Sequence, residues 1–387
     1  MNQPLAVKER ITAVDMLRGL VMIVMALDHI RDYTTYYHFA PEDLAQTTIP
    51  LFITRWVTHF CAPVFMFVAG VGSGLGEVNG KSKKQLSHFL WTRGVWLVLI
   101  EFTVVKLGWT FNFTDRTIYF LVIWALGICM IALAALIYVP KRWLLGLGIA
   151  MVLGHNVLDG ILPSSLGTLG PLWMILHVKG EFMIGPFATF IYYPVIPWVG
   201  VMALGYVFAD FYKTEANKRQ QQLVVLGLIL SLLFFVIRGI NSYGDMAPWS
   251  VQSTIGMTIV SFFNVTKYPP SLSYLLMTLG PSIMLLAIFE RIKGKASDFL
   301  MVFGRVPMFF YIIHLYLIHI LAVLIGWYQG YTFYDMSHDF ESFPADYGVG
   351  LVSTYTYWLL LIMLSYVLCK SYITFKKGKV HPFYSYI

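Results

Sequence analysis

Apolar stretches of about 20 residues recur along the whole chain, and short polar connectors separate them. A helix needs roughly 20 apolar residues to cross a hydrocarbon core of about 30 Å, and all its backbone polar groups are satisfied within the segment. Of the 387 residues, 58% are hydrophobic and 12% are charged, which excludes a water-soluble protein of this length. The sequence therefore predicts an all-α membrane protein, a polytopic bundle.

Ten of the apolar stretches are long enough to be transmembrane helices, and they form one integral membrane domain over residues 1–387. An even number of helices places both termini on the same side. The predicted spans are residues 11–31, 52–76, 88–110, 117–139, 143–158, 187–209, 222–240, 272–290, 299–326 and 349–369.

Basic residues mark alternate connectors between these spans, and the other connectors carry few lysines and arginines and hold most of the acidic residues. By the positive-inside rule, the basic side and both termini are predicted to be cytoplasmic. The basic connectors carry Lys8, Arg10, Lys81, Lys83, Lys84, Lys141, Arg142, Lys213, Lys218, Arg219, Arg291, Lys293, Lys295, Lys370, Lys376, Lys377 and Lys379.

The positive charge and the cysteines exclude several other classes of protein. The net charge of +7 comes from the topological lysines and arginines, so no nucleic-acid partner is expected. Cys61, Cys129 and Cys369 lie in separate apolar stretches, and neither they nor the histidines have a zinc spacing. The sequence therefore predicts no metal cofactor.

The first span carries a polar stripe, and each ionisable group inside a membrane requires a partner, a water-filled cavity or a function. Arg18 and His29 lie on this stripe about 16 Å apart, given the rise of 1.5 Å per residue. One helix face thus joins a basic cytoplasmic end to an imidazole near the outer end. The alternative is that Asp15 and Arg18 only form an ion pair at the membrane interface and that His29 only hydrogen-bonds to a neighbouring residue. The stripe consists of Asp15, Arg18, Met22, Met25, His29 and Asp32.

Further titratable groups follow near the outer end of this span. His38 lies in an outer connector and His59 begins the next predicted face, so with His29, Asp28 and Asp32 they form a cluster of proton-transfer groups. Glycines in the segment AGVGSGLG resemble a phosphate-binding loop, but they lie in a helix, where close helix packing is the better interpretation.

Two later spans also carry polar groups. Glu101 is an intramembrane carboxylate, for which structural pairing with Lys106 and a role in substrate binding are equally plausible. Tyr311 and His314 are three residues apart on one helix face and are predicted to contact the substrate.

Four segments resemble bacterial members of the heparan-alpha-glucosaminide N-acetyltransferase family and its wider relatives, the transmembrane acyltransferase superfamily. They are VDMLRGLVMIVMALDHIRDY, HFCAPVFMFVAGVGSGL, RGVWLVLIEFTVVKLGWTFNF and FGRVPMFFYIIHLYLIHILAV. The resemblance implies a multi-pass enzyme of the bacterial inner membrane. It takes an acetyl or other acyl group from cytoplasmic acetyl-CoA or acyl-CoA and transfers it to an amino sugar or other glycan acceptor on the far side.

The resemblance also implies roles for individual residues of this sequence. A polar residue of the first helix and a histidine shortly after it correspond to His29 and His38 in this sequence. The third corresponding position is acidic in lysosomal members, and it is His59 here, a departure from the family pattern.

These residues predict a mechanism for acyl transfer. His29 is the expected base, and Asp28 or Asp32 orients its imidazole. His38 or His59 either polarises the thioester carbonyl or carries a transient acyl group. Guanidinium and ammonium groups at the cytoplasmic end are expected to bind the coenzyme A phosphates. These are Arg18, Lys84, Arg93 and Arg305.

Two other functions remain open at the sequence level. Histidines on facing spans are also found in haem proteins, although the regular spacing of such pairs is absent. A transporter or flippase for a glycan or lipid-linked substrate would also place charges along its path. Membrane lipids are expected partners in every case, and a homo-oligomer is possible.

Overall fold

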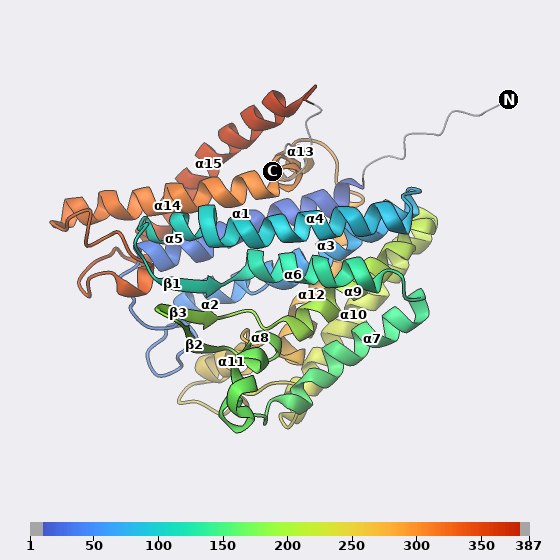
Figure 1. Ribbon diagram of the computed structural model, residues 1–387, viewed down its shortest axis with the longest axis horizontal. Helices are drawn as coiled ribbons and strands as arrows, with labels where there is room; N and C mark the ends of the chain where they lie inside the picture. The colour runs from blue at the N-terminus through green and yellow to red at the C-terminus, as the bar shows by residue number, and fades with distance from the viewer. Residues whose placement is uncertain (1–10, 380–387) are drawn as a thin grey trace.

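The computed structural model describes residues 11–379, so Lys8 and Arg10 lie outside the described residues. It is mostly helical, with long helices running side by side along the longest axis (Figure 1). Six helical segments are long and apolar enough to cross a membrane, and a seventh candidate is a pair of helices bent by 113°. The predicted helical membrane fold is confirmed, whereas the count of ten spans and the cytoplasmic termini stay predictions.

The helices of the first half extend over these residues: α1 (Thr12–Thr34), α2 (Ile49–Thr58), α3 (Cys61–Val78), α4 (Lys83–Ile100), α5 (Lys106–Thr110), α6 (Val122–Leu136), α7 (Lys141–Gly154) and α8 (Gly170–Leu176). Those of the second half are α9 (Val195–Phe208), α10 (Ala216–Ile240), α11 (Ile255–Phe263), α12 (Leu272–Phe289), α13 (Lys295–Arg305), α14 (Pro307–Gln329) and α15 (Leu351–Lys376).

Three predicted spans are interrupted. The span 52–76 is divided between α2 and α3, and the span 299–326 between α13 and α14, which starts at Pro307. A π-helix over Glu101–Val105 separates α4 from α5. Apolar length alone does not reveal these breaks, because the stretches on both sides of His59, Glu101 and Arg305 remain apolar.

A small sheet replaces the beginnings of two other predicted spans. Strand β1 (Thr117–Phe120) pairs in parallel with β3 (Phe187–Ile191), and β2 (Gly180–Ile184) pairs antiparallel with β3. Short apolar runs do not distinguish a strand from a helix, so the spans 117–139 and 187–209 were predicted to be helical from their first residue.

Glycines allow the helices to pack with their backbones in contact. A Cβ atom on Gly70 would lie 2.0 Å from the Met202 carbonyl oxygen, and one on Gly74 would lie 2.3 Å from that of Tyr206. Helix α3 therefore packs directly on α9, and these two glycines confirm the prediction of close packing rather than a phosphate-binding loop. Helices α1 and α13 are equally close, because a Cβ atom on Gly19 would lie 2.0 Å from the Leu300 carbonyl oxygen and one on Gly304 would lie 1.9 Å from that of Asp15.

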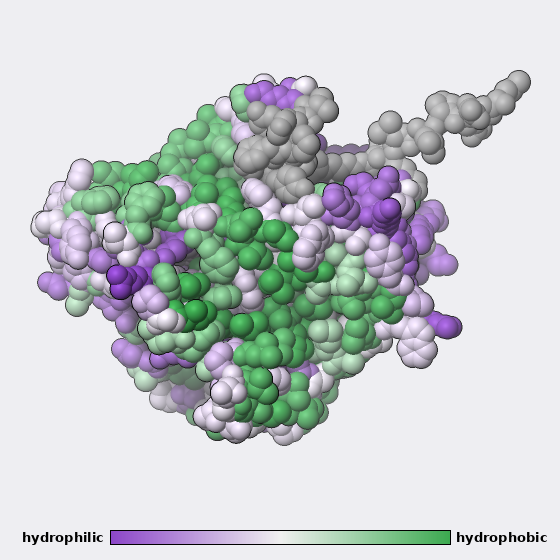
Figure 2. Space-filling view, in the orientation of Figure 1, coloured by the Kyte–Doolittle hydropathy of each residue, from purple (hydrophilic) through white to green (hydrophobic). Residues whose placement is uncertain are grey.

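The connectors that follow α3, α6 and α9 lie at one end of the bundle, on the right of Figure 1, and we call this the basic end. The sheet, α2 and α11 lie toward the opposite end, which we call the cavity end because a cavity opens there. Figure 2 shows hydrophilic residues gathered toward these two ends, with hydrophobic residues over the middle of this face. This distribution fits a band of lipid around the middle of the bundle.

The long connector between α10 and α12 is organised around one buried arginine. Arg238, which is 2% exposed, donates hydrogen bonds to the carbonyl oxygens of four residues. These are Phe262, Ala247, Ser261 and Asn264, at 2.7–3.1 Å. Asp245 fixes the same connector by accepting hydrogen bonds from Thr266 and Ser271. The connector thereby holds Lys267 at the cavity end.

Candidate active site

A cavity of about 760 Å³ opens at the cavity end, and it is large enough for a small-molecule ligand. Its wall is built from the last turns of α1, from α2, β1 and α14, and from the connectors before α2 and α12. Among the residues predicted from the sequence, five line it. These are Asp28, His29, Asp32, His38 and Tyr311.

His29 reaches the cavity and is hydrogen-bonded to a second histidine, His314. The His29 Nδ1 and His314 Nε2 atoms are 2.8 Å apart. The other nitrogen of His314, Nδ1, lies 3.0 Å from the carbonyl oxygen of Phe310, one turn earlier in α14. Trp109 packs edge-on against His29, with the ring centroids 4.9 Å apart. The two imidazoles are therefore held in fixed orientations.

The hydrogen bond to Phe310 assigns the protons in this pair. A carbonyl oxygen only accepts, so His314 Nδ1 carries a proton, and Nε2 of the neutral ring offers its lone pair. His29 Nδ1 then donates to His314 Nε2, which leaves the lone pair on His29 Nε2 free to accept a proton. His314 thus takes the place of the orienting carboxylate in a base-plus-carboxylate pair.

Asp28, the residue before His29, is surrounded by cations. Its carboxylate accepts hydrogen bonds from Arg55 at 2.6 Å and Thr58 at 2.7 Å, and it lies 2.8 Å from Arg31 and 3.8 Å from Lys267. Asp28 is 7% exposed. Its ion pairs thus connect α1, α2 and the α11–α12 connector, and it makes no hydrogen bond to the His29 ring among those described.

Asp32 and Glu42 extend this network toward the opening. Asp32 pairs with Arg31 at 2.6 Å, and Glu42 accepts a hydrogen bond from Arg55 Nε at 2.6 Å. Asp32 therefore does not orient His29 directly. His38 also lines the cavity and has an exposed side chain, so it is available to a ligand rather than committed to the network.

Glu42 predicts an effect of acid on folding. Burial opposes ionisation of this carboxyl, but the Arg55 guanidinium outweighs burial and lowers the pKa from 4.5 to about 2. A lowered pKa stabilises the fold above the unfolded value and loses this contribution as the pH falls from about 4.5 to 2. Glu42→Gln should therefore lower stability at pH 7 and flatten the fall in Tm between pH 5 and pH 3. Glu181→Gln, at an exposed carboxylate of β2, is the control; equal Tm curves for Glu42→Gln and the parent would contradict the assignment.

Glu101 does not line the cavity, although it was predicted to bind substrate. Its carboxylate accepts a hydrogen bond from the Trp124 backbone N–H at 2.8 Å. Trp124 belongs to the first turn of α6, where backbone N–H groups have no partner within the helix. Glu101 therefore caps α6, and the π-helix that begins at Glu101 lies beside the start of α6.

Replacement of Glu101 separates a capping role from substrate binding. Glu101→Ala leaves a buried N–H group unsatisfied and should destabilise the protein by about 1–3 kcal/mol, whereas Glu101→Gln retains an accepting oxygen and most of the stability. Thermal unfolding in detergent measures both effects. An unchanged Tm together with weaker acceptor binding in both variants would instead support a substrate contact.

His59 points away from the cavity. Its Nδ1 atom lies 2.8 Å from the Arg55 carbonyl oxygen, its ring packs against Tyr274, and only 1% of the residue is exposed. His59 is not among the cavity-lining residues. The structure thus joins His29 to His314 rather than to His59.

The residues predicted to bind coenzyme A lie toward the basic end. Arg18 donates hydrogen bonds to Asp15 and to the Gly304 carbonyl oxygen, each at 3.1 Å, which places it beside Arg305 at the end of α13. Lys84 is exposed in the first turn of α4, and Arg93 lies over the Phe89 ring. The structure therefore brings the Arg18 side chain to the backbone just before Arg305.

Another part of the cavity wall is aromatic and acidic. Tyr119 donates a hydrogen bond to Asp339 at 2.8 Å, and Tyr192 donates one to Glu341 at 3.4 Å. Burial and the neighbouring carboxylate raise the pKa of both tyrosines, so both remain neutral donors. Lys179 lies over the Tyr192 ring at 4.6 Å.

Three residues of the polar network were missed in the sequence: Arg31, Arg55 and Lys267. Arg31 is three residues after Asp28 in the same helix, and Arg55 is a charged residue inside an apolar stretch, so both carried a signal. Lys267 lies in a long connector, and only the fold brings it to Asp28.

The histidine contacts argue against a haem bound between His29 and His314. Metal–nitrogen bonds are about 2 Å long, so an ion does not fit between nitrogens 2.8 Å apart. His319 lies between the carbonyl oxygens of Gly108 and Met336, at 3.1 and 2.8 Å, and is likewise engaged.

Comparison with known protein families identifies a match for the first part of the chain. The model of the heparan-alpha-glucosaminide N-acetyltransferase catalytic domain matches residues 10–239, which are more than half of the 387 residues. A search of curated proteins found no match. The matched region contains α1 with His29, together with α2 and Arg55, and it ends within α10.

Proposed function

The chain belongs to the heparan-alpha-glucosaminide N-acetyltransferase family, and from this premise we propose that it transfers an acetyl or other acyl group from cytoplasmic acyl-CoA to an amino sugar or related glycan. The acceptor binds in the cavity, at the outer face of a bacterial inner membrane. The observation that carries this proposal is the fixed His29–His314 pair, whose free lone pair lies on the residue that lines the cavity.

The proposed chemistry needs one base and one proton donor, and His29 serves as both. His29 Nε2 takes a proton from the acceptor amine or hydroxyl as its nitrogen or oxygen attacks the thioester carbonyl carbon. The tetrahedral intermediate then collapses, the carbon–sulfur bond breaks, and the His29 imidazolium returns the proton to the leaving thiolate. The products are the acylated acceptor and free coenzyme A thiol, with no net change at His29.

Charge develops on the carbonyl oxygen in this reaction, and two cavity-lining residues are the proposed donors to it. These are Tyr311, whose ring lies 6.4 Å from that of His29, and Lys267, next to Asp28. Donors that are fixed before the reaction stabilise such charge without reorganisation. His38 is the remaining predicted residue free to contact the donor or acceptor.

The composition of the wall supports an amino-sugar acceptor. Carboxylates such as Asp339 and Glu341 attract an ammonium group and accept hydrogen bonds from hydroxyls. Tyr119 and Tyr192 beside them offer apolar ring faces together with hydroxyl groups, a combination suited to sugars.

The donor is proposed to bind at the basic end, on Arg18 and Arg305, with its arm directed toward His29. Met22 and Met25 lie between Arg18 and His29 on α1 and are 2% and 4% exposed. This face of α1 is therefore packed in the core, and delivery of the thioester to His29 requires these methionines to move.

Release of free thiol from acetyl-CoA by the purified full-length protein tests the proposal, with and without a panel of amino sugars. Release stimulated by one of the sugars would support the acyltransferase. A folded protein that releases no thiol but moves a glycan across proteoliposome membranes would replace the enzyme with the transporter.

A further inference from the structure

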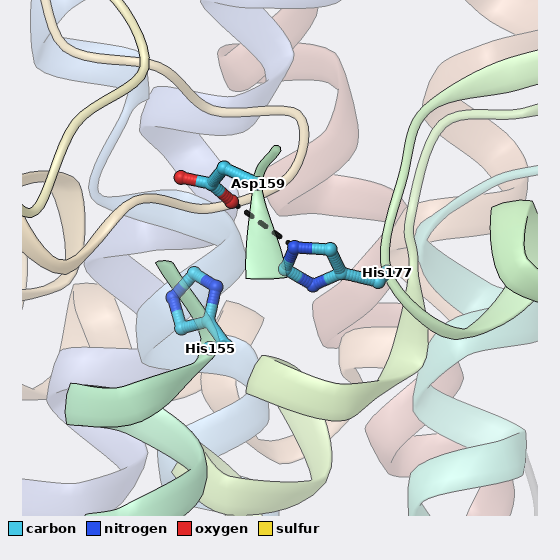
Figure 3. Close-up of side chains that lie close together, drawn as sticks. All are labelled: His155, Asp159 and His177. Atoms are coloured by element: carbon cyan, nitrogen blue, oxygen red, sulfur yellow. Dashed lines mark hydrogen bonds and ion pairs between the residues drawn. The ribbon is translucent and has the colours of Figure 1, made fainter. Parts of the chain in front are cut away.

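A second cluster of titratable side chains lies near the α7–α8 turn, outside the cavity lining. His155 and Asp159 follow α7, and His177 follows α8. Figure 3 shows the three side chains pointing toward one another from two segments of the chain. One ligand atom from each of them lies within 4.8 Å of the others.

Two nitrogens of one histidine in this cluster are buried without a hydrogen-bond partner. His155 is 2% exposed, and neither its Nδ1 nor its Nε2 atom has a partner. His177 is fully buried; its Nε2 lies 3.0 Å from Asp159 Oδ1, while its Nδ1 has no partner. A buried polar atom without a partner costs about 1–3 kcal/mol, so the unpartnered nitrogens of His155 and His177 favour a ligand that takes one nitrogen from each ring.

We propose that His155, Asp159 and His177 bind a divalent transition-metal ion, with zinc as the ion that fits best. Two imidazole nitrogens and one carboxylate oxygen are typical zinc ligands. Zinc with three protein ligands takes water as the fourth. The charge of the three ligands is also favourable. The two histidines are neutral, so the single carboxylate neutralises the bound ion only in part, and the ion can retain that water.

A neighbouring residue orients the carboxylate as expected for a metal ligand. Asn156 Nδ2 donates a hydrogen bond to Asp159 Oδ2 at 2.8 Å, which leaves Oδ1 for the ion. The Asn156 Oδ1 atom accepts a hydrogen bond from the Leu272 backbone N–H at 3.0 Å, at the first residue of α12. Such outer contacts fix the ligand geometry at metal sites.

The proposed ion would join segments that the cavity depends on. His155 ends the α7 segment, and His177 precedes Lys179, which lines the cavity, and the strand β2. The metal would therefore hold the α7–α8 turn and the beginning of the sheet together. None of its three ligands is a cavity-lining residue, so metal binding is measurable without any assay of catalysis.

The sequence does not reveal this site, and it predicts no metal. His155 and Asp159 are four residues apart in the sequence, but Asp159 hydrogen-bonds to His177, from a different segment. His177 is 22 residues after His155, a separation outside the short spacings typical of zinc motifs.

Metal analysis of the full-length protein in detergent tests the proposal, using an affinity tag without histidine. After loading with zinc and desalting, about one zinc per chain is expected by mass spectrometry, and His155→Ala and His177→Gln should each retain less than about a fifth of this. His88→Ala, at an exposed histidine in α4, is the matched control and should keep the parent value.

A thermal measurement on chelator-stripped parent protein covers the case in which the variants do not fold. Zinc should raise the Tm of the stripped protein by several degrees, because binding to the native state alone stabilises it, and Asp159→Asn should lose most of this rise. Cobalt should give visible d–d absorption in the parent. Less than a tenth of a zinc per chain and an unchanged Tm would overturn the proposal and leave a hydrogen-bonded polar cluster.

Discussion

Replacement of His29 by alanine is expected to lower the kcat of acyl transfer by about 10²–10⁴-fold, because a positioned general base contributes that much. The KM for acyl-CoA should stay within about twofold, since the imidazole acts on the acceptor proton rather than on the donor phosphates. Steady-state thiol release at saturating acceptor measures both constants. The large loss should persist at every pH at which the parent is active.

His314 provides the second half of this test. His314→Gln removes the ring that fixes the His29 tautomer but leaves His29 in place, so an intermediate loss of kcat of about 10–100-fold is expected, and the double variant should be no worse than His29→Ala alone. His338→Ala, in the connector between α14 and α15 and outside the cavity lining, is the matched control. Full activity in folded His29→Ala would refute the assignment of the base.

Replacement of Asp28 by alanine is expected to cause the largest loss of stability of any single change in the site. The change leaves Arg31 and Arg55 buried with one carboxylate partner fewer, and Glu42 is then the remaining ion-pair partner of Arg55 among the described residues. Removal of one partner from a buried ion pair costs about 3–5 kcal/mol because the remaining charge is uncompensated. Thermal or denaturant unfolding in detergent measures the loss.

A matched control and a compensating variant sharpen this second prediction. Glu181→Ala removes an exposed carboxylate of β2 and should change the Tm little. Asp28→Ala combined with Arg55→Met removes both charges of the closest pair and should recover part of the stability. An Asp28→Ala protein as stable as the parent would show that the network contributes nothing to folding.

Much of the membrane fold could be predicted from the sequence. Apolar stretches of membrane-spanning length identified helical segments along the whole chain, and their periodicity placed Arg18 and His29 on one face of α1. The breaks after Thr58 and around Glu101, and the strand β1, were not predicted, because in an apolar stretch the local choice of backbone conformation depends on packing partners that are distant in sequence.

The candidate site was predicted only in part. His29 and His314 were both selected as polar groups in membrane helices, but they lie 285 residues apart, and nothing local pairs them. Arg55 and Lys267 reach Asp28 only because α2 and the α11–α12 connector fold over the end of α1. The contact between Asp159 and His177 arises in the same way.

The membrane-helical class, the alternation of basic connectors and the shared helix face of Arg18 and His29 follow from the sequence, because hydrophobic length, charge and helical period are properties of short segments. Which groups meet depends on the packing of the whole chain: His29 with His314, Asp28 with three cations, Glu101 with α6, and His155 with His177 and Asp159. Hydrogen bonds and ion pairs act over about 3 Å, and segments far apart in the chain come that close only when their helices pack.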